Sequence, residues 1–379
     1  MRASARTRVT ATTAVCLAVG LGACGGAVGY ADGGGSGDRD GEIKIGLLLP
    51  ENETARYERF DRPLIERKVK ELCPDCRVDY ANALGDPWLQ RQQVDSMISR
   101  GVEVLVLDSV NVRSLRSAVV EAKKENIPVL SYDRLTEGPV AGFVGHRDGE
   151  VGRLEGEALL AALGPDAADA TVVVLEGPST RGWTGERQAA AFSVLQGKVK
   201  ATRTYATAQW DAADADAQMR GAIAALGVGH VDGVLAANDV LAAGAVAALK
   251  ADHIEPLPPV VAQDAELPAV QRVVKGEQYM SVYKPVKPEA DTAAEMAVAL
   301  GRGEKLTSMA TDRVSNDTSK GIPAVLFTPV PVTRATIKDT VGKDGTYTIG
   351  QICTPKLRSA CEKAGLLGPA GRDRVPPGT

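Results

Sequence analysis

A carboxylate and a guanidinium stand side by side directly after a short apolar run near the end of the first third of the chain. The run 127–130 (Ile-Pro-Val-Leu) predicts a buried strand that begins near a proline. Asp133 and Arg134 follow it, and together they supply hydrogen-bond acceptors and a rigid fork of donors. A polyhydroxylated molecule needs both, because each hydroxyl donates and accepts. The alternative is a surface ion pair at a strand end.

Polar side chains also follow three later apolar runs: Asn238-Asp239, Gln263-Asp264 and Lys284. The carboxyl ends of strands in an open α/β sheet are where ligands bind. Asp239 is interpreted as the N-cap of a helix over 240–250, since Asp is a favoured cap. Asp264 and Lys284 have no capping role in the predicted elements. Several strand ends that converge on one crevice predict a ligand cleft.

These residues are set in a regular alternation of strands and amphipathic helices that occurs twice. The first series predicts strands over 43–49, 77–80, 102–107, 127–130 and 140–144, with helices over 64–72, 88–99 and 115–125. The second predicts strands over 170–175, 199–205, 231–236, 260–263 and 279–283, with helices over 151–163, 186–195, 212–226, 240–250, 267–275 and 289–300. Alternation of this kind predicts parallel, doubly wound α/β sheets. A chain of 379 residues has room for two such lobes.

Composition argues against several classes of protein. The net charge is −4 and no Lys/Arg cluster forms a basic groove, so nucleic-acid binding is not expected. His146, His230 and His253 are scattered and no GxSxG elbow occurs, so we expect neither an enzyme nor a cofactor. The acidic residues over 211–216 are interpreted as a helix start rather than a calcium loop, and no metal site is predicted.

Residues 1–24 predict an export signal, with three arginines before a mostly apolar stretch. The tetrapeptide 21–24 (Leu-Gly-Ala-Cys) resembles the lipobox of bacterial lipoproteins, which implies lipidation of Cys24. The alternative is a plain secretory signal. Residues 25–41 are rich in Gly and Asp and predict a flexible tether.

Four cysteines remain after the predicted signal, and an even number outside the cytoplasm favours disulfides. Of the three possible pairings, the local one is favoured: Cys73 with Cys76 and Cys353 with Cys361. The motif Cys73-Pro-Asp-Cys76 also has a redox or zinc reading. It follows a helical pattern and precedes a strand, which is not the context that activates a redox thiol.

Several segments together resemble one family: 131–134 (Ser-Tyr-Asp-Arg), 237–239 (Ala-Asn-Asp) with Gly244, 263–267 (Gln-Asp-Ala-Glu-Leu) and 282–285 (Val-Tyr-Lys-Pro). They are similar to the xylose-binding proteins of sugar ABC transporters, which belong to the ribose-type periplasmic binding proteins. The resemblance runs from about residue 43 to about residue 361. It implies a type 1 fold of two Rossmann-like lobes joined by three hinge crossovers. The expected bounds are 42–149 plus 286–328 for the N-terminal lobe and 150–285 plus 329–379 for the C-terminal lobe.

The resemblance also implies the function and the site. It predicts a monomeric protein, lipid-anchored to the outer face of the cell membrane, that captures a monosaccharide and delivers it to an ABC permease. A sugar-sensing receptor subunit that presents its closed form to a membrane sensor is the rival. Carried over by position, the ligand-binding residues are Arg56, Tyr57, Asp133, Arg134, Trp210, Asn238, Asp264 and Lys284.

Two segments depart from the family pattern. In the loop 177–183, Arg181 and Trp183 stand where the family has an Asp and an Asn that bind the sugar. At the first crossover, His146-Arg147-Asp148 replaces the usual Phe-Asp-Asn. The departures imply a more cationic and more crowded cleft than a xylose site. The expected ligand is a xylose-like pentose or a related sugar, and an acidic or differently shaped sugar is the alternative.

Overall fold

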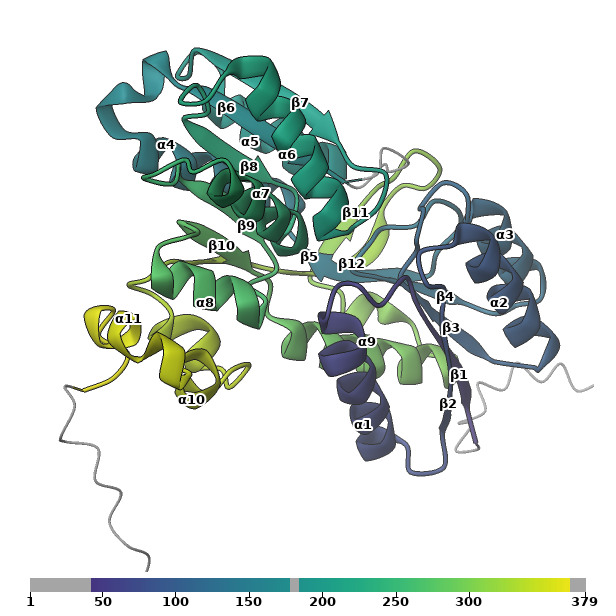
Figure 1. Cartoon of the computed structure of the whole chain (residues 1–379). Coiled ribbons are helices and arrows are strands. Elements are labelled where there is room, and N and C mark those ends of the chain that lie inside the picture. The colour runs from purple at the N-terminus through teal and green to yellow at the C-terminus, as the bar shows by residue number, and fades with distance from the viewer. Residues whose placement is uncertain (1–41, 178–183, 369–379) are drawn as a thin grey trace, which may run out of the picture. The chain divides into compact units, whose positions relative to one another are not determined.

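The computed structural model describes residues 42–177 and 184–368 (Figure 1). The predictions made for residues 1–41, including Cys24 and the tether, lie outside this part of the chain. So do the predictions for Arg181 and Trp183. Within the described residues, no helix combines the length and apolarity needed to cross a membrane.

The first sheet has the strand order β11-β12-β5-β4-β3-β1-β2. All neighbours are parallel except β11, which runs antiparallel to β12. The strands are β1 (Lys44–Leu49), β2 (Arg77–Asn82), β3 (Val104–Leu107), β4 (Val129–Tyr132), β5 (Gly142–His146), β11 (Asp312–Val314) and β12 (Ile322–Phe327). The helices that cover it are α1 (Arg62–Leu72), α2 (Pro87–Ser99), α3 (Arg116–Lys124) and α9 (Val286–Gly301), with the π-helical turn η1 (Tyr57–Asp61) before α1.

The second sheet has the order β13-β10-β9-β8-β6-β7, with only β13 antiparallel to its neighbour. Its strands are β6 (Thr171–Glu176), β7 (Ala201–Ala206), β8 (Gly233–Ala236), β9 (Val260–Gln263), β10 (Met280–Tyr283) and β13 (Val330–Val332). Its helices are α4 (Asp148–Leu163), α5 (Thr184–Leu195), α6 (Ala212–Leu226), α7 (Asp239–Ala251) and α8 (Leu267–Lys275). The short helices α10 (Ile349–Ile352) and α11 (Arg358–Lys363) pack near α8.

The chain passes between the two sheets three times: from β5 to β6 through α4, from β10 to β11 through α9, and from β12 to β13. The predicted fold class, two doubly wound α/β lobes with three crossovers, is confirmed. In both lobes the parallel strands end at one edge of the sheet. The polar residues that follow these strands therefore lie close together at that edge.

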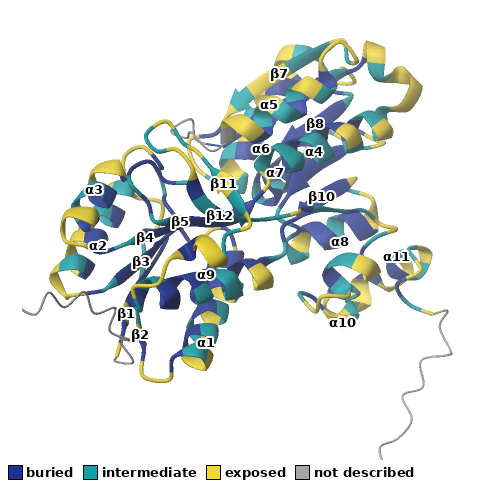
Figure 2. Ribbon diagram, turned by 180° about the vertical axis from the view of Figure 1, so that it is seen from behind, coloured by how far each residue is buried: buried dark blue, intermediate teal, exposed yellow. Residues whose placement is uncertain are grey.

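Each sheet is buried on both faces, which explains the near-continuous apolar strands. In β1, Ile45, Leu47 and Leu49 face a core shared with α1 and α9, whereas Leu48 faces α2 and α3. Figure 2 shows the central strands of both sheets as buried and the outer faces of the helices as largely exposed. Gly244 lets α7 approach α6 closely, because a Cβ there would overlap the carbonyl oxygen of Ala212.

Two local predictions were wrong in a way that matters for the site. The strand predicted over 140–144 is β5, which begins at Gly142 and ends at His146. Val140 N–H is used in a turn with Gly138 O, so the ladder starts later and His146 becomes the strand end.

The N-cap of α7 is Asn238, whose Oδ1 accepts from Leu241 N–H at 3.0 Å, and not Asp239 as predicted. Asp239 instead turns into the lobe. There its carboxylate accepts from Ser281 Oγ at 2.8 and 2.9 Å and from Gln278 Nε2 at 2.8 Å. A buried carboxylate must be hydrogen bonded, and these hydrogen bonds stabilise Asp239 more than a capping position would.

The favoured cysteine pairing is present in the structure. Cys73 is bonded to Cys76, with Cα atoms 5.2 Å apart, and Cys353 to Cys361, with Cα atoms 5.9 Å apart. The first closes the end of α1, and the second ties α10 to α11 around the buried Cys361. Because metal ligation needs thiolates, the disulfide-bonded cysteines do not form the zinc site of the alternative reading.

Candidate ligand-binding site

Eight of the ten predicted ligand-binding residues line one small cavity between the strand ends of the two sheets. Its volume is about 20 Å³, and it is lined by Thr54, Arg56, Tyr57, Asp133, Arg134, Trp210, Asn238, Gln263, Asp264 and Lys284. Space of this size holds about one water molecule. In this conformation the cavity is therefore too small to hold a sugar.

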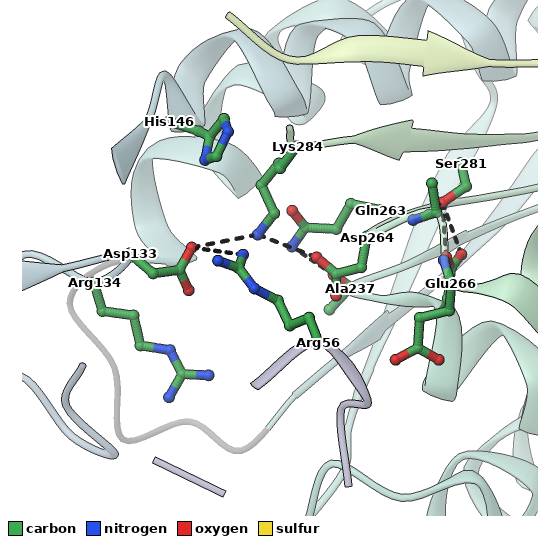
Figure 3. Close-up of polar contacts among 12 residues, drawn as sticks. Arg56, Asp133, Arg134, His146, Ala237, Gln263, Asp264, Glu266, Ser281 and Lys284 are labelled. Atoms are coloured by element: carbon green, nitrogen blue, oxygen red, sulfur yellow. Dashed lines mark hydrogen bonds and ion pairs between the residues drawn. The ribbon is translucent and has the colours of Figure 1, made fainter. Parts of the chain in front are cut away.

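Lys284 links the two lobes across the cavity. Its Nζ lies 3.1 Å from Asp264 Oδ1 and 3.8 Å from Asp133 Oδ1 (Figure 3). Burial alone lowers the pKa of Lys284, but Asp264 and Asp133 raise it above its ordinary value. The ammonium is thus held charged between one carboxylate from each sheet.

Both carboxylates are presented by strained backbone at the ends of their strands. Asp133 follows β4 with φ 54°, and Asp264 follows β9 with φ 96°. Residues other than glycine seldom adopt this left-handed region, at a cost of about 1–3 kcal/mol each. Such outliers cluster at functional sites, where the strain aims a side chain. Burial raises the pKa of Asp133, but Arg56 and Lys284 outweigh it and hold that pKa far below its usual range.

Arg56 is clamped by three carboxylates. It donates from Nε and Nη2 to Asp61 at 2.9 Å each, from Nη2 to Glu289 Oε2 at 2.7 Å, and from Nη1 to Asp133 Oδ1 at 3.1 Å. Asp61 also accepts a bond from the Tyr132 hydroxyl. Asp61 and Glu289 are fully buried, and sequence reasoning missed both. The clamp fixes the guanidinium so that one edge faces the cavity.

Arg134 is fixed in a similar way by three neighbours. It donates to Ser109 O at 3.1 Å and to the Tyr57 hydroxyl at 3.0 Å, and its Nε lies 3.5 Å from Asp108 Oδ1. Asp108 is fully buried at the end of β3, and burial raises its pKa well above the ordinary value despite the opposing effect of Arg134. Tyr57 and Arg134 therefore form one unit of the cavity wall.

The second lobe contributes an aromatic face and two amides. The ring of Trp210 lies against Gly177, where a Cβ would overlap the indole. Gln263 donates from Nε2 to Ala237 O at 3.0 Å, and Asn238 lines the cavity while its Oδ1 caps α7. An aromatic platform beside fixed polar groups suits a molecule with an apolar face and a polar rim.

Each cation that lines the cavity is paired with a buried carboxylate: Arg56 with Asp133, Arg134 with Asp108, and Lys284 with Asp264. The described residues thus offer no spare cation for an acidic sugar. The more cationic cleft predicted from Arg181 and Trp183 stays a prediction.

Asp133, His146 and Glu289 place one potential metal-ligating atom each within 4.8 Å of one another. The Arg56 guanidinium already bonds both carboxylates. A divalent cation would meet that fixed positive charge, so the donor set does not favour a metal. The absence of a metal site stays a prediction.

Glu266 connects the two lobes beside the cavity. Its raised pKa makes the free energy of unfolding depend on pH. Its Oε1 accepts from Ala55 N–H at 3.2 Å, and burial, reinforced by Asp239 and Asp264, raises its pKa from 4.5 to about 8. Between these values the folded protein keeps a proton that the unfolded chain has lost. Raising the pH therefore favours unfolding, by up to about 1.4 kcal/mol per pH unit for one group.

We expect the free energy of unfolding to fall between pH 5.5 and pH 8, measured by urea titration at several pH values. Asp148 and Glu155, whose pKa values burial raises to about 7, act in the same direction. Glu266→Gln should flatten the dependence, while Glu71→Gln, whose side chain is 57% exposed on α1, should not. An equal slope in the Glu266 variant and the unaltered protein would contradict the assignment.

Comparison with known proteins gives a consistent family. Residues 45–305 match the family described as periplasmic binding protein domain. The chain is 33% identical over 316 residues to the D-xylose-binding periplasmic protein of Haemophilus influenzae, covering 81% of this chain and 91% of that protein. It is also 33% identical to the D-xylose-binding periplasmic protein of Escherichia coli, over 80% of this chain and 91% of that protein.

A solved structure agrees with the sequence relatives. The ABC transporter solute-binding protein of Clostridium phytofermentans, with bound β-D-glucose, superposes with a TM-score of 0.74 at 26% identity, over 82% of this chain and 99% of that one. The expectation that this chain is not an enzyme agrees with a family of solute-binding proteins. Because the family model matches most of this chain, the chain belongs to the periplasmic binding proteins.

Proposed function

We propose that this protein captures a neutral monosaccharide of the xylose type between its lobes and delivers it to an ABC importer. The observation that carries the proposal is one cavity lined by Asp133, Asp264, Trp210 and three cations from both lobes. Fixed, charged donors and acceptors bond hydroxyls strongly, and the indole covers the apolar face of a sugar ring. The D-xylose-binding relatives support the same ligand class.

The paired cations favour a neutral sugar over an acidic one. A uronate would bring a charge that Arg56, Arg134 and Lys284 can meet only by giving up their present carboxylate partners. Because the cavity holds about one water, the lobes must separate to admit a sugar and close again around it. Ligand that bridges the lobes stabilises the closed form, which is the form offered to the permease.

The remaining parts of the proposal concern location. Residues 1–24 direct export, lipidation of Cys24 anchors the protein to the outer face of the membrane, and residues 25–41 act as the tether. Radiolabelled palmitate should be incorporated by cells that express the full chain and not by cells that express Cys24→Ser. Label in both would contradict the anchor.

The deciding experiment is calorimetric titration of the full-length protein, purified in detergent and stripped of bound sugar by unfolding and refolding. The panel contains pentoses, hexoses and the corresponding sugar acids. Micromolar or tighter binding of xylose or another neutral sugar supports the proposal. A sugar at 100 times its Kd should also stabilise the protein by about 2.7 kcal/mol. Binding of sugar acids alone, or of no sugar, would contradict it.

A further inference from the structure

A further polar side chain, that of His146, is buried near the candidate site. It ends β5 at the first crossover, and its side chain is only 1% exposed. Among the described residues, neither Nδ1 nor Nε2 has a hydrogen-bond partner. A buried polar group left in this state costs about 1–3 kcal/mol. An unbonded buried polar group in a native protein therefore calls for an explanation, such as a role in binding a ligand.

The surroundings of the ring point to the ligand cavity. Nδ1 lies 3.5 Å from Glu289 Oε1, which is also unpartnered among the described residues, while Glu289 Oε2 holds Arg56. A ring nitrogen lies within 4.8 Å of a carboxylate oxygen of Asp133. Figure 3 shows the imidazole on the side of Lys284 and Asp133 that is turned away from Asp264. The ring is therefore next to the acceptor that the proposed sugar would use.

His146 lines one cavity, and the neighbouring Asp133 lines another. The cavity at His146 has a volume of about 600 Å³ and is also lined by Phe143, Arg147 and Asp148. Asp133 lines the small cavity of about 20 Å³.

We propose that His146 determines specificity by hydrogen bonding a hydroxyl of the sugar adjacent to the one bonded by Asp133. This inference rests on the proposed sugar-binding function and adds the recognition of one particular hydroxyl. A neutral imidazole carries one donor and one acceptor, which matches a hydroxyl in either orientation. The two protein atoms, within 4.8 Å of each other, are spaced to serve neighbouring hydroxyls of a single ring.

The test is a double-mutant cycle between the side chain and each sugar hydroxyl. The full-length protein and His146→Phe are titrated with the best-binding sugar and with its set of monodeoxy analogues. His146→Phe should weaken the parent sugar about 5- to 10-fold, the loss of one hydrogen bond. It should leave the affinity for one deoxy analogue unchanged, because that analogue lacks the hydroxyl in question.

Two further variants separate contact from indirect effects. Glu289→Gln alters the clamp on Arg56 and should weaken every analogue alike. His146→Gln keeps a donor and an acceptor, should recover part of the parent affinity, and provides the readout if the Phe variant does not fold. A uniform loss across all analogues, or no loss, in the His146 variants overturns the inference. Failure of the unaltered protein to bind any sugar instead overturns the proposed function, and this inference with it.

Discussion

Arg56→Met is expected to lower the free energy of unfolding by about 3–5 kcal/mol, because it leaves buried charges without their partner. The guanidinium bonds Asp61, Asp133 and Glu289, of which Asp61 and Glu289 are fully buried. Methionine fills a similar volume, so the loss reports on charge rather than on a cavity. Chemical denaturation monitored by circular dichroism measures the change.

A matched control lies on the surface of the second lobe. Arg220 bonds Asp216 one turn earlier on α6, and its side chain is 48% exposed. Exposed pairs of this kind contribute little to stability because solvent screens them, so Arg220→Met should change the free energy of unfolding little. Arg56→Lys should recover only part of the loss, since an ammonium cannot copy the fork of donors. If Arg56→Met is as stable as Arg220→Met, the clamp does not contribute as described.

Lys284→Met is expected to weaken sugar binding by about 100-fold or more. Removing one partner of a buried charge pair costs about 2–5 kcal/mol of binding free energy, partly because the other charge is left unpaired. Here Asp264 and Asp133 would both lose the ammonium that joins them. Calorimetric titration with the best-binding sugar measures the loss.

The control is Lys287→Met, three residues further along the chain. Lys287 bonds Asp291 on the surface of α9, with its side chain 61% exposed. This variant should bind sugar like the unaltered protein. Thermal denaturation of both variants confirms that any loss of binding occurs in folded protein. Unchanged affinity in Lys284→Met would remove this residue from the proposed site.

The sequence predicted the elements whose ends carry local signals. The helices α6 and α8 have the predicted bounds, because Asp211 caps the start of α6 and Gly276 at φ 84° ends α8. Apolar runs located the strands β1 to β10 to within about two residues, whereas β12 was not predicted. The resemblance supplied Arg56, Tyr57 and Trp210, which pattern alone did not single out.

The supporting residues were missed because their partners are distant in the chain. Glu289 lies 233 residues from Arg56, and acids on helices are usually exposed. Asp61 belongs to the π-helical turn η1, whose sequence lacks a clear apolar period. Only their contacts in the folded protein distinguish these buried acidic residues from acidic residues on the surface. The short edge strands β11 and β13, of three residues each, were missed for the same reason: pairing across the sheet defines them.

The position of Trp210, against Gly177 and in the cavity wall, makes intrinsic tryptophan fluorescence a probe of ligand binding. The chain has three tryptophans, of which Trp88 is 76% exposed and Trp210 lines the ligand cavity. A sugar that covers the indole replaces water at one face, and the emission colour and lifetime of Trp210 change with occupancy. Trp88 supplies a constant background. Fluorescence in a Trp183→Phe chain would therefore report binding in real time without any attached dye.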